Sequence, residues 1–394
     1  MRIMSRFKPL KIISISFFSF SLAWLPAEAF QVKNLYEVRM ISDNQLRAER
    51  QRLTEEAFRE LLIRITGKTD ITKTLEGKAL LEKAAQYVNQ FRYEKEQLDP
   101  SPSAFQTSLL ASSASSQTEG ILDEEPALPT ALPVRYQDVL VVLFDEKAVK
   151  EALWEKRLPV WGNTRPTTLV WLGFQDAQGR YLLDASEDTE ILRSLRKYGK
   201  KRGLPLVFPL LDLEDQININ INDVWGDFRE PIVNASMRYQ TEAVLAARVF
   251  LDSFGVWQGR WSLYQGDEAT SWRTRGHSIE SLISAGLSQS AETLALKYAN
   301  ISADDDAVTG IKVQITDVST LQDFVKLDKY LLSLSTVSAT HISEVHANSV
   351  IFDIELRSDS SGFEKAVSLG KMLIKNNEAF FSPVDEQLSF RLIP

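Results

Sequence analysis

The sequence of 394 residues contains no cysteine. A chain without cysteine forms no disulfide and offers neither a thiol nucleophile nor a thiolate metal ligand. It has three histidines, and His341 and His346 are five positions apart, not four as in a helical zinc motif. It also contains no glycine-rich nucleotide-binding loop and no Gly-x-Ser-x-Gly motif. These absences predict a protein that holds neither a metal nor a cofactor and carries no catalytic signature.

An excess of basic residues is absent as well. The chain has 45 Lys and Arg against 53 Asp and Glu, a net charge of −8 and a pI near 5.2. Nucleic-acid-binding proteins concentrate positive charge on one face. The composition therefore argues against nucleic acid as a partner.

The N-terminus has the three parts of a cleavable signal peptide over residues 1–29. Four basic residues precede an apolar stretch at 12–25, which is short for a membrane span. Ala27-Glu28-Ala29 is a small-x-small cleavage pattern, so the mature chain should begin at Phe30. Losing four positive charges and one negative charge changes the net charge from −8 to −8 − 4 + 1 = −11. We expect a periplasmic protein with no lipid anchor and no later membrane span; the alternative is an uncleaved N-terminal anchor.

The next segment, residues 35–67, predicts a strand followed by a long helix. Alternation over residues 35–41 is typical of a half-buried strand. Ser42 and Gln45 have the spacing of a helix capping box. Apolar residues then recur at steps of three, four and seven, which places them on one buried stripe, and Gly67 is a suitable end. Leu62 lies near the centre of this stripe.

Composition changes divide the rest of the chain into three predicted domains. Residues 30–157 form an α/β domain that contains a helix at 75–91 and a strand at 138–144. Proline and serine enrichment at 99–133 predicts a disordered insertion in this domain. Residues 158–303 form a central α/β domain. There, a strand at 167–174, a helix at 187–203 and a strand at 204–211 fit a parallel crossover, followed by antiparallel strands at 243–250, 257–264 and 270–274.

The last domain, residues 307–394, has the order β-α-β-β-α-β of a ferredoxin-like module. The predicted class is therefore a multi-domain α/β and α+β protein.

Three sequence pieces carry a resemblance to a known family. They are LYEVRMIS with LLIRITG, FPLLDLED with DVWGDF, and ASMRY with VLAARVF and WQGRWSLY. They resemble a proteobacterial family of exported proteins catalogued as domain of unknown function 2066, over about residues 35–299. The resemblance implies an exported protein without an established activity, and it transfers no functional residue.

An acidic cluster follows the predicted strand at 204–211. Asp212, Asp215 and Asp223 would lie beyond the carboxyl end of a strand, where open α/β sheets often bind ligands. They could bind a metal or act as acid and base. The favoured alternative is a solvated, irregular loop with helix-capping aspartates.

A second candidate is the tryptophan hairpin. Trp257 and Trp261 share one face of the predicted strand, whereas Arg260 lies on the other, and Trp225 precedes them in the chain. These residues could form an aromatic docking surface for a sugar polymer or a protein. The favoured alternative buries the tryptophans against the helix predicted at 278–299.

Taken together, the sequence predicts a non-enzymatic interaction or assembly factor of the cell envelope with a protein partner. The competing hypothesis is an envelope hydrolase or a polysaccharide-binding enzyme that uses the three aspartates.

Overall fold

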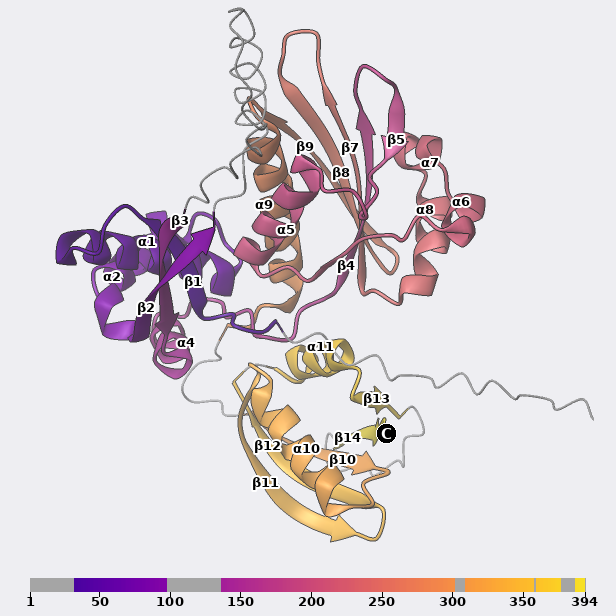
Figure 1. Cartoon of the computed structure of the whole chain (residues 1–394). Helices are drawn as coiled ribbons and strands as arrows, with labels where there is room; N and C mark the ends of the chain where they lie inside the picture. The colour runs from indigo at the N-terminus through magenta and orange to yellow at the C-terminus, as the bar shows by residue number, and fades with distance from the viewer. Residues whose placement is uncertain (1–31, 98–135, 302–308, 358, 377–386, 394) are drawn as a thin grey trace, which may run out of the picture.

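The computed structural model describes residues 32–97, 136–301, 309–357, 359–376 and 387–393 (Figure 1). The predicted signal peptide at 1–29 and the predicted insertion at 99–133 lie outside these ranges. The described residues form ten α-helices and three sheets. This arrangement confirms the multi-domain α/β and α+β class.

The N-terminal unit is a three-stranded antiparallel sheet covered by a long helix. Its strands β1 (Glu37–Ser42), β3 (Tyr136–Phe144) and β2 (Val88–Gln97) lie in the order β1-β3-β2. Helix α1 (Arg47–Thr66) buries the predicted stripe from Leu53 onward, with Leu61, Leu62 and Ile65 fully buried. Leu46, the first residue of the predicted stripe, precedes the helix and is exposed. It ends at Gly67, whose φ of 74° is left-handed. Helix α4 (Glu146–Glu155) follows β3 and is capped by Asp145.

Two predictions for this unit are wrong. Ser42 does not cap α1, because its hydroxyl donates to the carbonyl of Asn44, and the helix starts after Leu46 without a side-chain cap. The second helix is also shorter than predicted: α2 (Leu75–Leu81) is followed by the 3-10 turn η2 (Ala84–Tyr87). Strand β2 then begins at Val88, so the last four residues of the predicted helix, 88–91, lie in the strand that pairs with β3 instead.

The central unit is a six-stranded mixed sheet between two layers of helices (Figure 1). Its main path has the order β5-β4-β7-β8-β9, and β6 (Leu206–Val207) pairs with β4. Helices α5 (Glu190–Arg202) and α9 (Ile279–Tyr298) cover one side, here named the two-helix face. Helices α6 (Leu213–Asn218), α7 (Ile221–Gly226) and α8 (Arg229–Ser236) cover part of the other, the three-helix face. The strands on the path are β5 (Arg180–Leu182), β4 (Thr168–Gln175), β7 (Ala243–Leu251), β8 (Trp257–Gln265) and β9 (Glu268–Gly276).

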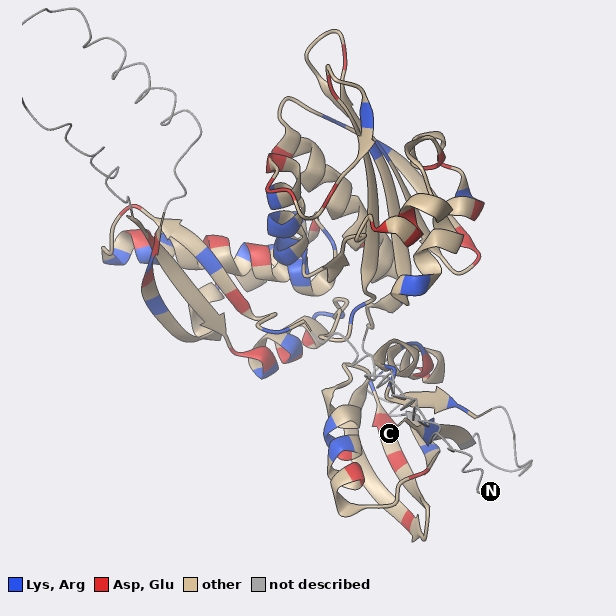
Figure 2. Ribbon diagram, turned by 45° about the vertical axis from the view of Figure 1, so that its right-hand side comes forward, with Lys and Arg blue, Asp and Glu red and all other residues tan. Residues whose placement is uncertain are grey.

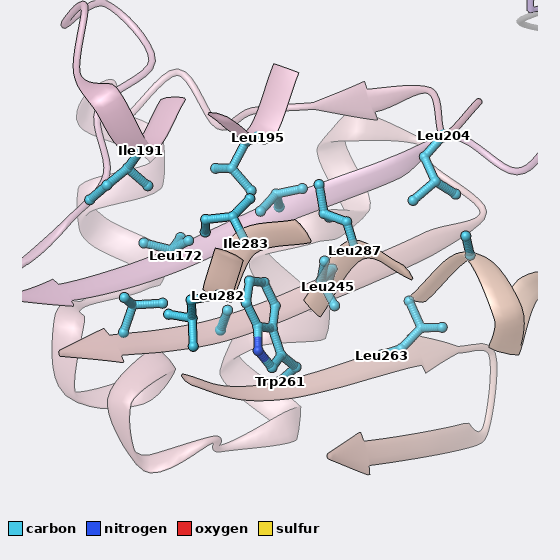
Figure 3. Packing of buried hydrophobic residues seen from close by; sticks show 14 of the residues in the cluster. Leu172, Ile191, Leu195, Leu204, Leu245, Trp261, Leu263, Leu282, Ile283 and Leu287 are labelled. Carbon is cyan, nitrogen blue, oxygen red and sulfur yellow. The ribbon is translucent and has the colours of Figure 1, made fainter. Parts of the chain in front are cut away.

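The core of the two-helix face is the larger of the two. Trp261 of β8 lies against Leu282 and Ile283 of α9 (Figure 3). Leu195 of α5 and Leu245 of β7 belong to the same cluster. Because these apolar side chains are buried between the sheet and the two helices, they determine which side of each strand faces α5 and α9.

The segment after α5 differs from the prediction. The apolar stretch at 204–211 pairs with β4 only at Leu206 and Val207. Proline lacks an N–H for a sheet ladder, and Pro205 and Pro209 flank this short strand. The residues at 216–222, predicted to be an irregular loop, instead lie mostly in the capped helices α6 and α7.

The C-terminal unit is a five-stranded sheet in the order β11-β12-β10-β14-β13. Its elements are β10 (Thr309–Thr316), α10 (Leu321–Ser333), β11 (Val337–His346), β12 (Ser349–Leu356), α11 (Ser360–Gly370), β13 (Leu373–Lys375) and β14 (Gln387–Leu392). The predicted order holds through α11, but two strands follow it rather than one. The chain reverses at Lys371, with a φ of 51°, to form the edge strand β13. Strand β14 is then inserted parallel to β10.

A buried arginine joins the first two units. Arg165 is 2% exposed, and all of its N–H groups donate to main-chain carbonyls. Three of these carbonyls, those of Arg64, Arg202 and Gly203, lie at the C-terminal ends of α1 and α5. Helix C-termini carry partial negative charge, so they compensate a guanidinium that has no carboxylate partner among the described residues. Burial and the nearby charge of Arg64 lower the pKa of Arg165.

None of the helices in the described part of the chain is both long enough and apolar enough to cross a membrane.

Candidate functional site

The strand register of the central sheet aligns three arginines. Arg248 of β7 lies directly opposite Arg260 of β8, and Arg260 lies directly opposite Arg273 of β9. Directly opposite residues of antiparallel strands point to the same side with their Cβ atoms about 4.5–5.5 Å apart. The three side chains therefore form a row on the three-helix face. Like charges placed this way destabilise a sheet, by roughly 0.2–1 kcal/mol per pair.

Two further arginines extend the row toward the β7–β8 hairpin. Arg275 lies two residues beyond Arg273 on the same side of β9, opposite Gln258. Arg180 of β5 lies opposite Gln175 of β4. We call these five residues the arginine surface: Arg180, Arg248, Arg260, Arg273 and Arg275.

Few carboxylates balance the arginine surface. Asp227 lies 3.7 Å from Arg260, and its carboxylate also accepts hydrogen bonds from the hydroxyls of Ser262 and Tyr264, both 2.6 Å long. The side chains of Arg273 and Arg275 make no hydrogen bond or ion pair with another described residue, and both residues are exposed. A further carboxylate, that of Asp252, has its pKa lowered by hydrogen bonds, the one from the N–H of Val256 most, and also by the charge of Arg275. Most of the positive charge is therefore available to an external anion.

The uncharged partners of the surface hold two guanidinium groups in place. Arg248 donates to the carbonyl of Trp225 at 2.7 Å, and Arg180 donates to the side chain of Gln175 at 2.9 Å. Arg180 also stacks over the Trp225 ring, with 4.3 Å between the guanidinium carbon and the ring centroid. Burial and the positive charge of Arg260 lower the pKa of Arg248. Lowering of this kind is expected where cations gather without enough counter-charge.

The structure separates the residues of the predicted tryptophan surface. Trp225 and Arg260 lie on the three-helix face, whereas Trp257 and Trp261 lie on the two-helix face. Trp261 is fully buried, and its indole fills the space beside Gly286 of α9, where an added Cβ would lie 2.2 Å from a ring atom. Trp257 is partly buried and stacks on Phe174, with ring centroids 5.8 Å apart. These two side chains therefore pack in the core region under α9.

The three aspartates are also placed in two groups. Asp212 accepts a hydrogen bond from the N–H of Asp215 at the start of α6, and both carboxylates bind Arg238, at 2.7 and 3.1 Å. The guanidinium of Arg238, followed by that N–H, lowers the pKa of Asp212 to about 2. Asp223 accepts from the N–H of Asn220 in the capping box of α7. Asp212 and Asp223 thus stabilise helix starts, whereas the carboxylate of Asp215 accepts from Arg238, Tyr239 and the N–H of Leu211. No group of three or more potential metal ligands occurs in the described ranges.

The C-terminal end of α5 carries a second group of basic residues, which differs from the arginine surface. Arg202 is buried at the junction with the N-terminal unit, where it donates to the carbonyl of Gly67. Lys201 pairs with Glu60 at 3.1 Å and Arg193 with Asp188 at 2.8 Å. The basic residues form blue bands along α5 in Figure 2. Partners inside the protein take up much of this charge, unlike that of the arginine surface.

Sequence reasoning found Arg260 and Trp225 but missed Arg180, Arg248, Arg273 and Arg275. The signal was present, because the predicted strands contain all three arginines of the row. Their alignment depends on the register of two successive hairpins, which alternation alone does not determine. Pairing of β7, β8 and β9 therefore brings together arginines that are distant in the sequence.

Comparison with known families bears on the N-terminal unit alone. Residues 29–162 match the model of a family described as a domain of unknown function (DUF8605). This family is different from domain of unknown function 2066, so the resemblance drawn from the three sequence pieces is wrong. Those pieces consist of ordinary strand and helix patterns, which many families share. No curated protein matches the chain. The arginine surface lies outside the matched residues.

Proposed function

We propose that this protein is an exported, non-enzymatic interaction factor of the cell envelope that binds a negatively charged partner through the arginine surface. The single observation that carries the proposal is the row Arg248, Arg260 and Arg273. Its like charges oppose folding, so a partner that supplies carboxylate or phosphate groups would bind there with favourable electrostatics. Arg273 and Arg275 are exposed on the edge strand β9, where a partner can reach this part of the arginine surface.

The positions of the aspartates support a binding role over the competing hydrolase. General acid–base catalysis requires carboxylates that can reach a substrate. Asp212 and Asp215 instead contact Arg238, and the Asp215 side chain is 1% exposed. Asp223 is occupied by the start of α7.

Binding is tested with a soluble acidic probe, poly-glutamate, titrated against the chain that starts at Phe30. We expect saturable binding that weakens with added salt, because exposed charges are screened. The double variant Arg273→Glu, Arg275→Glu should lose this binding. Its matched control, Lys197→Glu with Lys200→Glu, makes the same charge change on α5. Equal binding by the arginine variant and the unmodified chain would refute the proposal.

Export is tested separately. The predicted signal peptide gives a chain whose first residue is Phe30. We expect N-terminal sequencing of the protein recovered from the periplasmic fraction to begin at that residue. Recovery of a chain that retains Met1 would contradict cleavage and favour the uncleaved anchor.

A further inference from the structure

The hairpin between β7 and β8 ends in an ordered turn. The carboxylate of Asp252 accepts hydrogen bonds from the N–H groups of Phe254 and Val256, at 2.9 and 3.0 Å, and from the side chain of Gln258 at 2.7 Å. Gly255 supplies the positive φ of 74° that the turn needs. These hydrogen bonds lower the pKa of Asp252, the one from Val256 most. The turn is thus fixed before any partner arrives.

This ordered turn presents apolar side chains to solvent. Phe254 is 89% exposed and Leu251 is 47% exposed. A phenylalanine held outward on a fixed turn gains nothing from the fold, so its full burial energy is available to a partner. The tip is a projection rather than a groove, since Phe254 extends beyond the last residues paired between the two strands.

The arginine surface lies at the same end of the sheet as this tip. Arg275, Gln258 and Phe250 occupy successive positions of one cross-strand row, which lies next to the turn. The row of Arg248, Arg260 and Arg273 crosses the same three strands two residues further from the turn. Because β4 and β7 are parallel, the β4–β5 hairpin that carries Arg180 projects in the same direction, as Figure 1 shows. Figure 2 shows blue segments on the strands below these hairpins.

A projecting apolar tip beside a cationic face is the arrangement that binds an anionic membrane surface. Apolar side chains enter the interface, and arginines contact the lipid phosphates. An acidic peptide would be held better by a groove lined with apolar pockets. Glu190 and Glu280 lie at the starts of α5 and α9 on the two-helix face. We therefore expect the protein to approach an anionic bilayer with the arginine surface turned toward the lipid.

We propose that the arginine surface and the Phe254 tip dock this protein on the surface of a bilayer that contains anionic phospholipid. The proposal rests on the proposed function, because it names the partner of the same surface. It requires no chemical step: the lipid phosphates bind the guanidinium groups, and Phe254 with Leu251 enters the interfacial region.

The test measures co-sedimentation of the chain starting at Phe30 with vesicles. This start removes the apolar stretch at 12–25, which would partition into lipid by itself. Vesicles of phosphatidylglycerol mixed with phosphatidylcholine are compared with vesicles of phosphatidylcholine alone. We expect salt-sensitive binding to the anionic vesicles, with at least about 20-fold weaker binding for Arg273→Glu, Arg275→Glu. Phe254→Ser should weaken binding about 10-fold.

Matched controls separate a specific surface from general charge or apolarity. Lys197→Glu with Lys200→Glu makes the same charge change on α5. Phe228→Ser removes another exposed phenylalanine, 56% exposed, near the opposite end of the sheet, where Arg229 contacts Gly266. Both controls should bind the anionic vesicles like the unmodified chain.

Three outcomes would overturn the inference. If poly-glutamate binds through the arginines and binds Phe254→Ser equally well, while the vesicles do not bind, the arginine surface recognises an acidic protein. The proposed function then stands and the membrane inference falls. If neither probe binds, both are wrong. If the control variants lose vesicle binding as strongly as the test variants, the arginine surface has no special role in lipid binding.

Discussion

Replacing Arg165 by methionine should uncouple the N-terminal and central units. Methionine keeps an unbranched chain of similar length but removes every donor that the guanidinium supplies. The carbonyls of Arg64, Arg202 and Gly203 lose their bonds of 2.9, 3.0 and 3.2 Å at a position that water does not reach. A buried acceptor left without a partner costs about 1–3 kcal/mol, so these three carbonyls imply a loss of at least about 3 kcal/mol.

Two effects oppose this loss. Removing a buried charge relieves its desolvation and the repulsion from Arg64, which together lower the pKa of Arg165. The helix ends that compensate this charge remain, however, and they then lack any cation. The loss of the stacking contact with Trp161, at 4.0 Å, adds to the destabilisation.

The assay is urea unfolding of the chain that starts at Phe30, followed by tryptophan fluorescence and by far-UV circular dichroism. At a slope of about 1–3 kcal/mol per molar urea, a loss of about 3 kcal/mol lowers the midpoint by about 1 M or more. Arg193→Met is the control, because Arg193 is 47% exposed and paired with Asp188. Such a surface pair contributes about 0–1 kcal/mol. Equal midpoints for the two variants would refute the role assigned to Arg165.

Three further predictions concern local packing and charge. Leu62→Ala should lower the free energy of unfolding of the N-terminal unit by about 2–5 kcal/mol, because Leu62 is fully buried. Glu56→Ala on the exposed face of α1 should change it by less than about 0.5 kcal/mol. Equal urea midpoints for the two variants would contradict burial of this stripe. Gly286→Ala should destabilise the central unit by about 1–3 kcal/mol, because the new methyl group overlaps the indole beside it, and an unchanged melting temperature would show that the core can yield. Arg238→Met should raise the pKa of Asp212 from about 2 toward its ordinary value near 3.8, as followed by carboxyl NMR titration. The folded-state pKa is the depressed one, so Asp212 stabilises the fold above pH 4 and this contribution is lost between about pH 4 and pH 2; a titration unaffected by the substitution would exclude Arg238 as the cause.

Regular periodicity made α1 the most predictable element. Its apolar positions repeat with the helical period over 20 residues, and Leu61, Leu62 and Ile65 are all buried as expected. The segment after α5 was harder to predict, because Pro205 and Pro209 shorten its strand. Local capping by Asp212 and Asn220 then makes helices of a sequence that alternates like a loop or a strand.

The candidate site was predictable in part. Alternation correctly divided Trp261 from Arg260, since adjacent strand residues point to opposite sides. The favoured alternative, burial of the tryptophans against the helix at 278–299, is confirmed for Trp261. Alternation could not, however, align Arg248 with Arg273 across an intervening strand. Strand register is a tertiary property, set by the packing of Trp261 against α9 rather than by the local pattern.

The pairing of β2 with β3 has a consequence for how this chain can change in length. Gln97 and Tyr136 are cross-strand partners, although residues 98–135 separate them in the sequence. Both ends of that connection therefore meet at one point of the sheet. Each doubling of the length of a loop adds only about 0.6 kcal/mol of closure cost. A fused domain or a reporter inserted between Gln97 and Tyr136 should therefore leave the β1-β3-β2 register unchanged.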